Sequence, residues 1–206
     1  MKHDYHSSLT TPVETKPRQR VQLGDSLAFV ADLGKGLPKE FAACDILYAE
    51  VAWERTYNRF VERAGRGCTY EEYLRSIAAV ASEAAQPCVL VCGKRALRGL
   101  PEPIDAVPVN LNTGGRFIAE AVVVSYRCKV PDVRERHRNW TNMDTENLLH
   151  ALTEKHNRIG DPCCGYGNTG RVFAEHGRQF VLSDINPMCI GYIAEHAKTW
   201  VPRVVA

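Results

Sequence analysis

The sequence lacks any long apolar run. Its 206 residues contain no stretch of the roughly 18 apolar residues that a membrane-spanning helix requires. The first twenty residues have no apolar core and do not form a secretory signal peptide. We therefore expect a soluble globular protein with no membrane partner, located in the cytoplasm of a bacterium or, if it is viral, of the host cell.

Paired metal-binding cysteines are absent as well. None of the eight cysteines shows Cys-x-x-Cys spacing, so the sequence predicts no zinc site and no other metal site. Several cysteines lie inside apolar runs, such as Cys-Val-Leu-Val-Cys at 88–92. This placement indicates buried, reduced thiols of a cytosolic protein.

The chain also has little excess charge. Its 26 basic and 24 acidic residues give a net charge of +2, which neither demonstrates nor excludes a polyanionic partner. The basic residues nevertheless gather in a few places, and each cluster is either a phosphate-binding surface or simply a solvated face. These clusters are Arg55, Arg59, Arg63 and Arg66, residues 94–98, and residues 127–138.

What remains alternates between strand-like and helix-like patterns, with no internal repeat. Residues 1–20 are polar and aperiodic, which predicts a flexible N-terminal arm before a single domain at 21–206. Strands are expected at 21–23, 45–51, 88–92, 106–111, 117–127 and 180–184. Helices are expected at 26–33, 69–85 and 145–156, and after residues 168 and 187. With a hairpin turn at 112–115, the alternation predicts a three-layer α/β fold, parallel except for one antiparallel hairpin.

Residues 159–170, Ile-Gly-Asp-Pro-Cys-Cys-Gly-Tyr-Gly-Asn-Thr-Gly, are the most informative stretch. The pattern is typical of a strand end, a tight glycine turn and a helix start, and the next strand ends in Asp184. Gly165 and Gly167, which have no Cβ, would let a ligand approach the backbone closely. Asp184 is then placed to bond a ribose hydroxyl, so the unit predicts a nucleotide site.

Asp161 distinguishes between nucleotide ligands. The G-x-G-x-x-G pattern at 165–170 fits a dinucleotide site formally, but a carboxylate at the strand end would repel a pyrophosphate. The same carboxylate suits the cationic amino end of a ligand that carries an amino acid. Asp161 therefore favours S-adenosylmethionine over NAD.

Three segments together resemble a known family. Residues 161–169 are similar to the cofactor motif D-P-x-C-G-x-G-x-T of S-adenosylmethionine-dependent amino-methyltransferases that act on DNA. Residues 45–53, Asp-Ile-Leu-Tyr-Ala-Glu-Val-Ala-Trp, resemble the catalytic strand D-x-x-x-A-D-P-P-W of the adenine-N6 enzymes. Residues 23–27, Leu-Gly-Asp-Ser-Leu, resemble the opening G-D-x-L element, near the adenine of the cofactor. The resemblance covers about residues 21–198, nearly the whole chain.

The resemblance implies a Rossmann-like methyltransferase sheet in circularly permuted order, because the catalytic segment precedes the cofactor motif. Family members usually carry an inserted target-recognition domain, and no segment here is long enough to form one. DNA contacts would then fall to the basic clusters, and a homodimer or heterodimer stays open. The implied cofactor-binding residues are Asp25, Asp161, Pro162, Cys163, Gly165, Gly167, Asn168, Thr169, Asp184 and Ile185.

The implied catalytic residues are Glu50, Val51, Ala52 and Trp53, and they depart from D-P-P-W. Glu50 can accept a hydrogen bond from an exocyclic amine, and Trp53 can stack on a flipped base. Val51 and Ala52 remove the prolines that make the turn rigid, and glutamate is longer than aspartate by one methylene, about 1 Å of displacement. Three functions therefore stay open: adenine-N6 methylation of DNA, another reaction that uses S-adenosylmethionine, and an inactive relative that binds nucleic acid or a partner.

A cytosine-C5 mechanism would require a nucleophilic cysteine, typically in a Pro-Cys dipeptide after the catalytic strand. Cys88 follows a proline at the start of a strand, far from the edge where ligands bind. Cys163 also follows a proline but lies in the cofactor motif itself. Neither thiol is expected to be a nucleophile.

Overall fold

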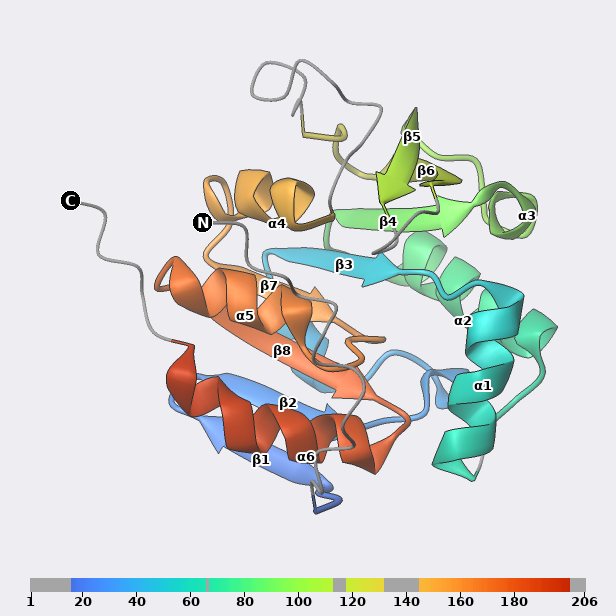
Figure 1. Ribbon diagram of the computed structural model, residues 1–206. Coiled ribbons are helices and arrows are strands. Elements are labelled where there is room, and N and C mark those ends of the chain that lie inside the picture. The colour runs from blue at the N-terminus through green and yellow to red at the C-terminus, as the bar shows by residue number, and fades with distance from the viewer. Residues whose placement is uncertain (1–15, 66, 113–117, 132–144, 201–206) are drawn as a thin grey trace.

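One eight-stranded sheet organises the chain, with the strand order β1-β2-β8-β7-β3-β4-β6-β5. The computed structural model describes residues 16–65, 67–112, 118–131 and 145–200. Helices cover both faces of the sheet, which confirms the predicted three-layer α/β architecture (Figure 1). The strands are β1 (Arg20–Leu23), β2 (Ser26–Val30), β3 (Ile46–Glu50), β4 (Cys88–Gly93), β5 (Asp105–Asn112), β6 (Ile118–Tyr126), β7 (Arg158–Asp161) and β8 (Gln179–Asp184).

The five central strands, β2, β8, β7, β3 and β4, are parallel. Their continuous apolar sequences follow from this position, because a central parallel strand is covered on both faces. All six residues of β4 are buried, as the run at 88–92 predicted. Successive residues of a strand point to opposite faces, so Ile46 and Tyr48 join one apolar cluster while Leu47 and Ala49 join the other.

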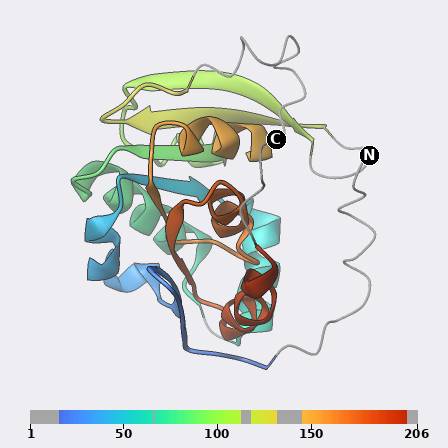
Figure 2. The same cartoon turned by 90° about the vertical axis from the view of Figure 1, so that its left-hand side faces the viewer.

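The helices divide between these two clusters. Helices α4 (Thr145–Thr153), α5 (Asn168–Glu175) and α6 (Pro187–His196) pack on one face of the sheet, and α1 (Glu54–Ala64) and α2 (Tyr70–Glu83) on the other. Both views show the orange and red helices gathered on one side of the sheet (Figures 1 and 2). In the described part of the chain, no helix is both long and apolar enough to cross a membrane. The short helices are α3 (Lys94–Leu97), η2 (Leu33–Lys35), η3 (Lys39–Ala43) and η5 (Ala197–Thr199).

The hairpin of β5 and β6 at one edge confirms the predicted antiparallel pair. Strand β6 runs against both β4 and β5. The turn at 113–117 lies outside the described residues, as does 132–144, which holds most of the basic run at 127–138.

The opposite edge corrects one prediction, because the expected helix at 26–33 is instead strand β2. Leu27 and Phe29 enter one apolar cluster and Ala28 the other, which is the alternation of a strand. The Ser26 hydroxyl accepts a hydrogen bond from the Phe180 amide at 3.0 Å, so it serves the sheet rather than a helix cap. Strand β1 then pairs antiparallel with β2 and adds a second hairpin to the sheet.

The structure describes only residues 16–20 of the predicted N-terminal arm at 1–20. Residues 1–15 lie outside the described residues. The Arg18 amide donates to the Pro187 carbonyl at 3.1 Å, and the Val30 amide donates to the Gln19 carbonyl at 2.8 Å. Residues 16–20 are therefore docked on the domain.

Candidate functional site

The carboxyl ends of the parallel strands bring the predicted residues together at one edge of the sheet. Strand β7 ends at Asp161, and it lies between β8, which ends at Asp184, and β3, which ends at Glu50. Ligands of open parallel sheets bind at this edge. Segments more than 100 positions apart in the sequence thus form one candidate site.

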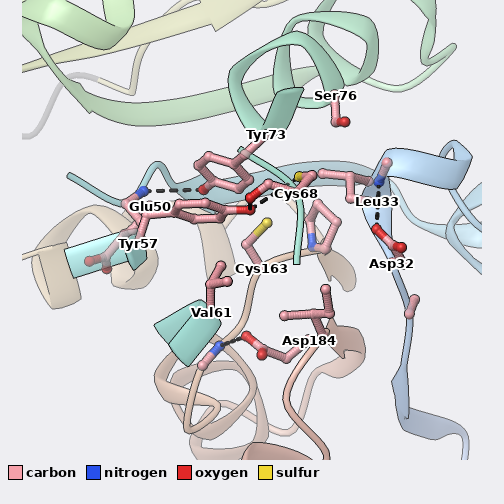
Figure 3. Close-up of a pocket in the computed structure, with 16 residues that line it drawn as sticks. Asp32, Leu33, Glu50, Tyr57, Val61, Cys68, Tyr73, Ser76, Cys163 and Asp184 are labelled. Carbon is pink, nitrogen blue, oxygen red and sulfur yellow. Dashed lines mark hydrogen bonds between the residues drawn. The ribbon is translucent and has the colours of Figure 1, made fainter. Parts of the chain in front are cut away.

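A first cavity lies between the ends of β2 and β8 and helix α1 (Figure 3). Asp184 and Gly165 line one side, and Tyr57 and Val61 of α1 form the outer wall. Its volume is about 100 Å³. Among the predicted residues, Glu50, Ala52, Pro162, Cys163, Gly165, Asp184 and Ile185 line it.

A second cavity, of about 380 Å³, lies on the other side of Glu50. The predicted residues that line it are Glu50, Val51, Ala52, Trp53, Asp161, Cys163, Gly165, Asn168 and Thr169. The two cavities share four of their walls, Glu50, Ala52, Cys163 and Gly165. The predicted catalytic and cofactor-binding residues therefore meet where the two cavities adjoin.

The glycines of the turn have different physical roles. Gly165 has φ +51°, and a Cβ there would meet nothing within 4 Å, so space is open over its backbone. Gly167 has φ +85°, but a Cβ there would lie 2.8 Å from Ile193 and 2.9 Å from Trp200. The close approach of a ligand that we expected at both glycines is therefore available at Gly165, whereas Gly167 admits the packing of α6 against the turn.

Asp184 is held in place by the turn that it faces. One carboxylate oxygen accepts from the Gly165 amide at 3.0 Å, and the other accepts from the Asn186 amide at 2.8 Å. Burial raises the pKa of this carboxyl group. A carboxylate has about four lone-pair sites, so roughly two remain for a ligand in the first cavity.

Asp161 is buried beneath the glycine turn. Its carboxylate accepts from the Cys163 amide at 3.0 Å and from the Thr169 hydroxyl at 2.6 Å. Burial raises the pKa of Asp161 to about 7, and the nearby carboxylates of Glu50 and Asp184 add to the rise. A cation placed next to it would favour the ionised form. Asn168, another predicted cofactor-binding residue of this turn, already has a partner: its side-chain oxygen accepts a hydrogen bond from the Arg171 guanidinium at 2.8 Å.

Glu50 ends strand β3 with its side chain exposed. The Tyr48 hydroxyl donates to the Glu50 carboxylate at 3.0 Å. The Val51 amide donates to the Val91 carbonyl at 2.8 Å, which extends the parallel pairing of β3 and β4 by one residue. Glu50 is thus fixed at the rim of both cavities.

Trp53 rests on the backbone of the neighbouring strand. A Cβ at Gly93, the last residue of β4, would lie 2.9–3.2 Å from three carbons of the indole ring. Gly93 has an ordinary φ of −75°, so its function is to seat the ring rather than to form a turn. One side of the indole is covered in this way, and the side chain is still 41% exposed. Trp53 is therefore an aromatic platform at the second cavity.

The structure does not bring Asp25 to this edge. Asp25 precedes β2, and its carboxylate accepts from the Gln179 side chain at the amino end of β8, at 3.2 Å. Two positions after the carboxyl end of β2 lies Asp32, which lines the first cavity and accepts from the Gly34 amide at 3.0 Å. Sequence reasoning missed Asp32 because β2 was interpreted as a helix; as a strand, its end would have been aligned with Asp184.

The surroundings of the two candidate thiols disfavour the thiolate form. Burial raises the pKa of Cys88 to about 12, and the residue lies at the amino end of β4. Cys163 lines both cavities, but burial raises the pKa of its thiol as well. Five of the eight cysteines are buried, in agreement with the sequence.

No protein-family model matches this chain, and no curated protein matches it. Among solved structures, the chain is similar to TTHA0409 of Thermus thermophilus, described as a candidate DNA modification methylase. The TM-score is 0.54 at 15% identity, over 85% of this chain and 96% of that one. TTHA0409 complexed with S-adenosyl-L-methionine gives a TM-score of 0.51 at 14% identity, over 85% and 94% of the chains. M1.HpyAVI gives 0.53 at 13% identity, over 82% and 97%. These similarities show a shared fold.

Proposed function

We propose that this protein is an S-adenosylmethionine-dependent methyltransferase whose acceptor is an exocyclic amine of a nucleic-acid base, the N6 amine of adenine in DNA. The observation that carries the proposal is the pair of cavities that adjoin at Glu50 and Gly165. A transfer between two bound molecules requires two such spaces with the reacting groups at their boundary. The solved structures of TTHA0409 and M1.HpyAVI with S-adenosyl-L-methionine support the choice of cofactor for this fold.

The polar groups of the first cavity suit the cofactor. Asp184 would hold the ribose hydroxyls, and Gly165 leaves space for close approach. Asp161, which lines the adjoining second cavity, would pair with the amino group where the two cavities meet. When bound, the cofactor supplies an electrophilic methyl group. The cavity of about 100 Å³ is smaller than the roughly 300–1,000 Å³ of common ligand sites. A further cavity of about 710 Å³ shares Asp32, Leu33, Gly34, Cys68 and Ser76 with it, so the space open to the ligand extends beyond the first cavity.

The second cavity suits a flat heterocycle with an amine. Trp53 would stack on the ring, and Glu50 would accept a hydrogen bond from the amine. This bond orients the lone pair of the nitrogen, and the carboxylate can then take the proton that the nitrogen loses after it gains the methyl group. The resemblance of residues 45–53 and 161–169 to the adenine-N6 enzymes supports adenine as the base.

We also propose that the chain is circularly permuted relative to that family. The catalytic strand β3 precedes the cofactor strand β7 by more than 100 positions, yet the two are paired at the centre of the sheet. Termini of compact domains lie near the surface, so the sheet can be retained when the chain is opened elsewhere.

Label transfer tests the proposed function. The protein is incubated with S-adenosylmethionine labelled in the methyl group and with unmethylated DNA, and the DNA is then digested to nucleosides. We expect the label in N6-methyladenine. Cofactor turnover without label in DNA would move the acceptor to another class of molecule, and binding of cofactor or DNA without turnover would make the protein an inactive relative.

Helix α1 predicts where the nucleic-acid backbone binds. It starts directly after Trp53, and Arg55 and Arg59 are exposed one turn apart on the same side. Neither forms an ion pair with another described residue. Changing both to alanine should weaken duplex binding and reduce the slope of log K against log salt by roughly 2, because each phosphate contact contributes about 0.9. Fluorescence anisotropy at several salt concentrations measures both quantities.

The control for this experiment removes the same charge elsewhere. Lys39 and Lys155 are exposed and precede the amino ends of β3 and β7, on the far edge of the sheet. Changing both to alanine should leave the salt slope unchanged. Equal losses in the two double variants would mean that net charge, and not α1, binds the DNA.

Asp161 predicts a pH dependence of cofactor binding. Burial raises its pKa to about 7 in the free protein, and an ammonium group bound beside it would lower that pKa again. Below pH 7, binding of S-adenosylmethionine must therefore release a proton from Asp161. The affinity for the cofactor should rise roughly tenfold between pH 6 and pH 8. Calorimetry across this range measures the effect, and Asp161→Asn should flatten it. A flat profile in the unmodified protein would remove the ammonium role of Asp161.

A further inference from the structure

Two tyrosine hydroxyls form hydrogen bonds, here called the tyrosine grip, to Ala52 in the segment that stands where the D-P-P-W motif has its two prolines. The Ala52 amide donates a hydrogen bond to the Tyr73 hydroxyl at 3.1 Å, and the Tyr70 hydroxyl donates to the Ala52 carbonyl at 3.1 Å. Both tyrosines belong to α2, one turn apart (the first of these bonds is drawn in Figure 3). Both polar groups of one peptide residue, two positions after Glu50, are therefore fixed by side chains.

The grip leaves one backbone acceptor of this segment available. The Val51 amide is bound to the Val91 carbonyl, and both polar groups of Ala52 are bound to the tyrosines. The Val51 carbonyl accepts no hydrogen bond from the residues that the structure describes. An exocyclic amine carries two hydrogens, so the Glu50 carboxylate and the Val51 carbonyl could accept one each.

The two tyrosines are themselves rigid. Their rings and that of Tyr57 form a packed cluster, in which Tyr57 and Tyr73 stack at 4.5 Å between centroids. Burial raises the pKa of both hydroxyl groups, so they remain protonated and able to donate. Thr69 and Glu72 form a capping box that fixes where α2 begins, which sets the direction of both side chains.

We propose that Tyr70 and Tyr73 are positioning residues that take over the role of the two prolines; the proposal rests on the function proposed above. Proline makes a turn rigid by fixing φ and by removing an N–H that would otherwise need a partner. In this chain Ala52 retains its N–H, and Tyr73 supplies that partner. The tyrosines thus hold the Val51 carbonyl and Glu50 in a fixed relation to the second cavity.

The test compares Tyr70→Phe and Tyr73→Phe with Tyr126→Phe. Tyr126 is also buried, but its hydroxyl donates to the Pro101 carbonyl at 3.1 Å, and the residue lines neither cavity. We expect kcat to fall roughly 10- to 100-fold in the first two variants, as for a misplacement of about 1 Å. The KM for DNA and the affinity for S-adenosylmethionine should change less than about twofold, because catalysis alone depends on this geometry. Tyr126→Phe should retain kcat within about twofold.

A rescue separates positioning from general support of the fold. Adding Ala52→Pro to Tyr73→Phe removes the unpaired N–H and restores a fixed φ, so kcat should recover by about tenfold. The same proline would not repair a destabilised core. Unchanged kcat in Tyr70→Phe and Tyr73→Phe, an equal loss in Tyr126→Phe, or no recovery with the proline would each overturn the positioning role.

Hydrogen exchange makes the result independent of enzymatic activity. In the full-length protein, the Ala52 amide should exchange about tenfold or more faster in Tyr73→Phe than in Tyr126→Phe, because it loses its buried partner. If exchange is unchanged, the grip itself is absent. If exchange accelerates while the unmodified protein shows no methyl transfer, the grip stands and the proposed function has failed.

Discussion

Replacing Glu50 with glutamine is expected to abolish methyl transfer and to leave the affinity for S-adenosylmethionine within a few fold. The side chain ends β3 where the two cavities adjoin, and glutamine has nearly the same volume there. Glutamine cannot take up the proton that the amine loses, and general-base catalysis contributes roughly 10²- to 10⁴-fold. We therefore expect kcat to fall by at least about a hundredfold, measured by label transfer to DNA.

Glu120→Gln is the matched control for this variant. Glu120 is exposed on β6, where it is paired with Lys94, away from both cavities. The same chemical change at that position should leave both kcat and cofactor affinity unaltered. If Glu50→Gln retains most of its activity, the acceptor of the amine hydrogen is another residue.

Glu50→Asp tests whether the longer carboxylate belongs to this site. Aspartate is the residue of the D-P-P-W motif that residues 50–53 resemble, but it withdraws the carboxylate by about 1 Å. It also breaks the hydrogen bond from Tyr48, which is 3.0 Å long. We expect this change to lower kcat. A lower kcat would show that the site is built for the longer glutamate side chain together with its hydrogen bond from Tyr48.

The central sheet could be predicted because its signals are local in the sequence. Continuous apolar runs at 45–51 and 88–92 identify buried parallel strands, and parallel strands align their carboxyl ends. Once Asp161, Asp184 and Glu50 were each placed at a strand end, their meeting at one edge followed from topology alone. No side-chain geometry was needed for this part of the site.

The missed strand and the missed Asp32 have one cause. A five-residue apolar run that follows a serine fits a capped helix and a buried strand equally well. What decided its structure was pairing with β8, including the bond from the Phe180 amide to Ser26, 154 positions away. The position of Asp32 depended on that pairing and was lost with it.

The tyrosine grip and the seat of Trp53 could not be predicted for a different reason. Each depends on how α2 or β4 approaches the segment after β3, with contacts such as Tyr73 to Ala52 and Gly93 to Trp53. From the sequence, Tyr70 and Tyr73 fit the apolar face of a helix, and Gly93 fits a strand terminus. The absent prolines are therefore compensated by contacts between segments that lie apart in the sequence. A comparison of motifs shows only that the prolines are absent.

Replacing Asp184 with alanine should abolish cofactor binding while the protein stays folded. The carboxylate is oriented by the Gly165 and Asn186 amides and lines the first cavity. We propose that its remaining lone pairs accept from two ribose hydroxyls. Hydrogen bonds to a charged group contribute roughly 1.5–3 kcal/mol each, so losing two of them should weaken binding by roughly 10²- to 10⁴-fold. Calorimetry with S-adenosylhomocysteine measures the change, and circular dichroism checks the fold.

Two further aspartates give this experiment its controls. Asp25 lies at the opposite edge of the sheet, so Asp25→Ala should leave the affinity unchanged. Asp32 lines the same cavity as Asp184, so Asp32→Ala should weaken binding as well. If Asp25→Ala weakens binding and Asp32→Ala does not, the ligand lies elsewhere than the first cavity. If Asp184→Ala binds normally, the ribose role of this residue is wrong, whatever the acceptor of the methyl group is.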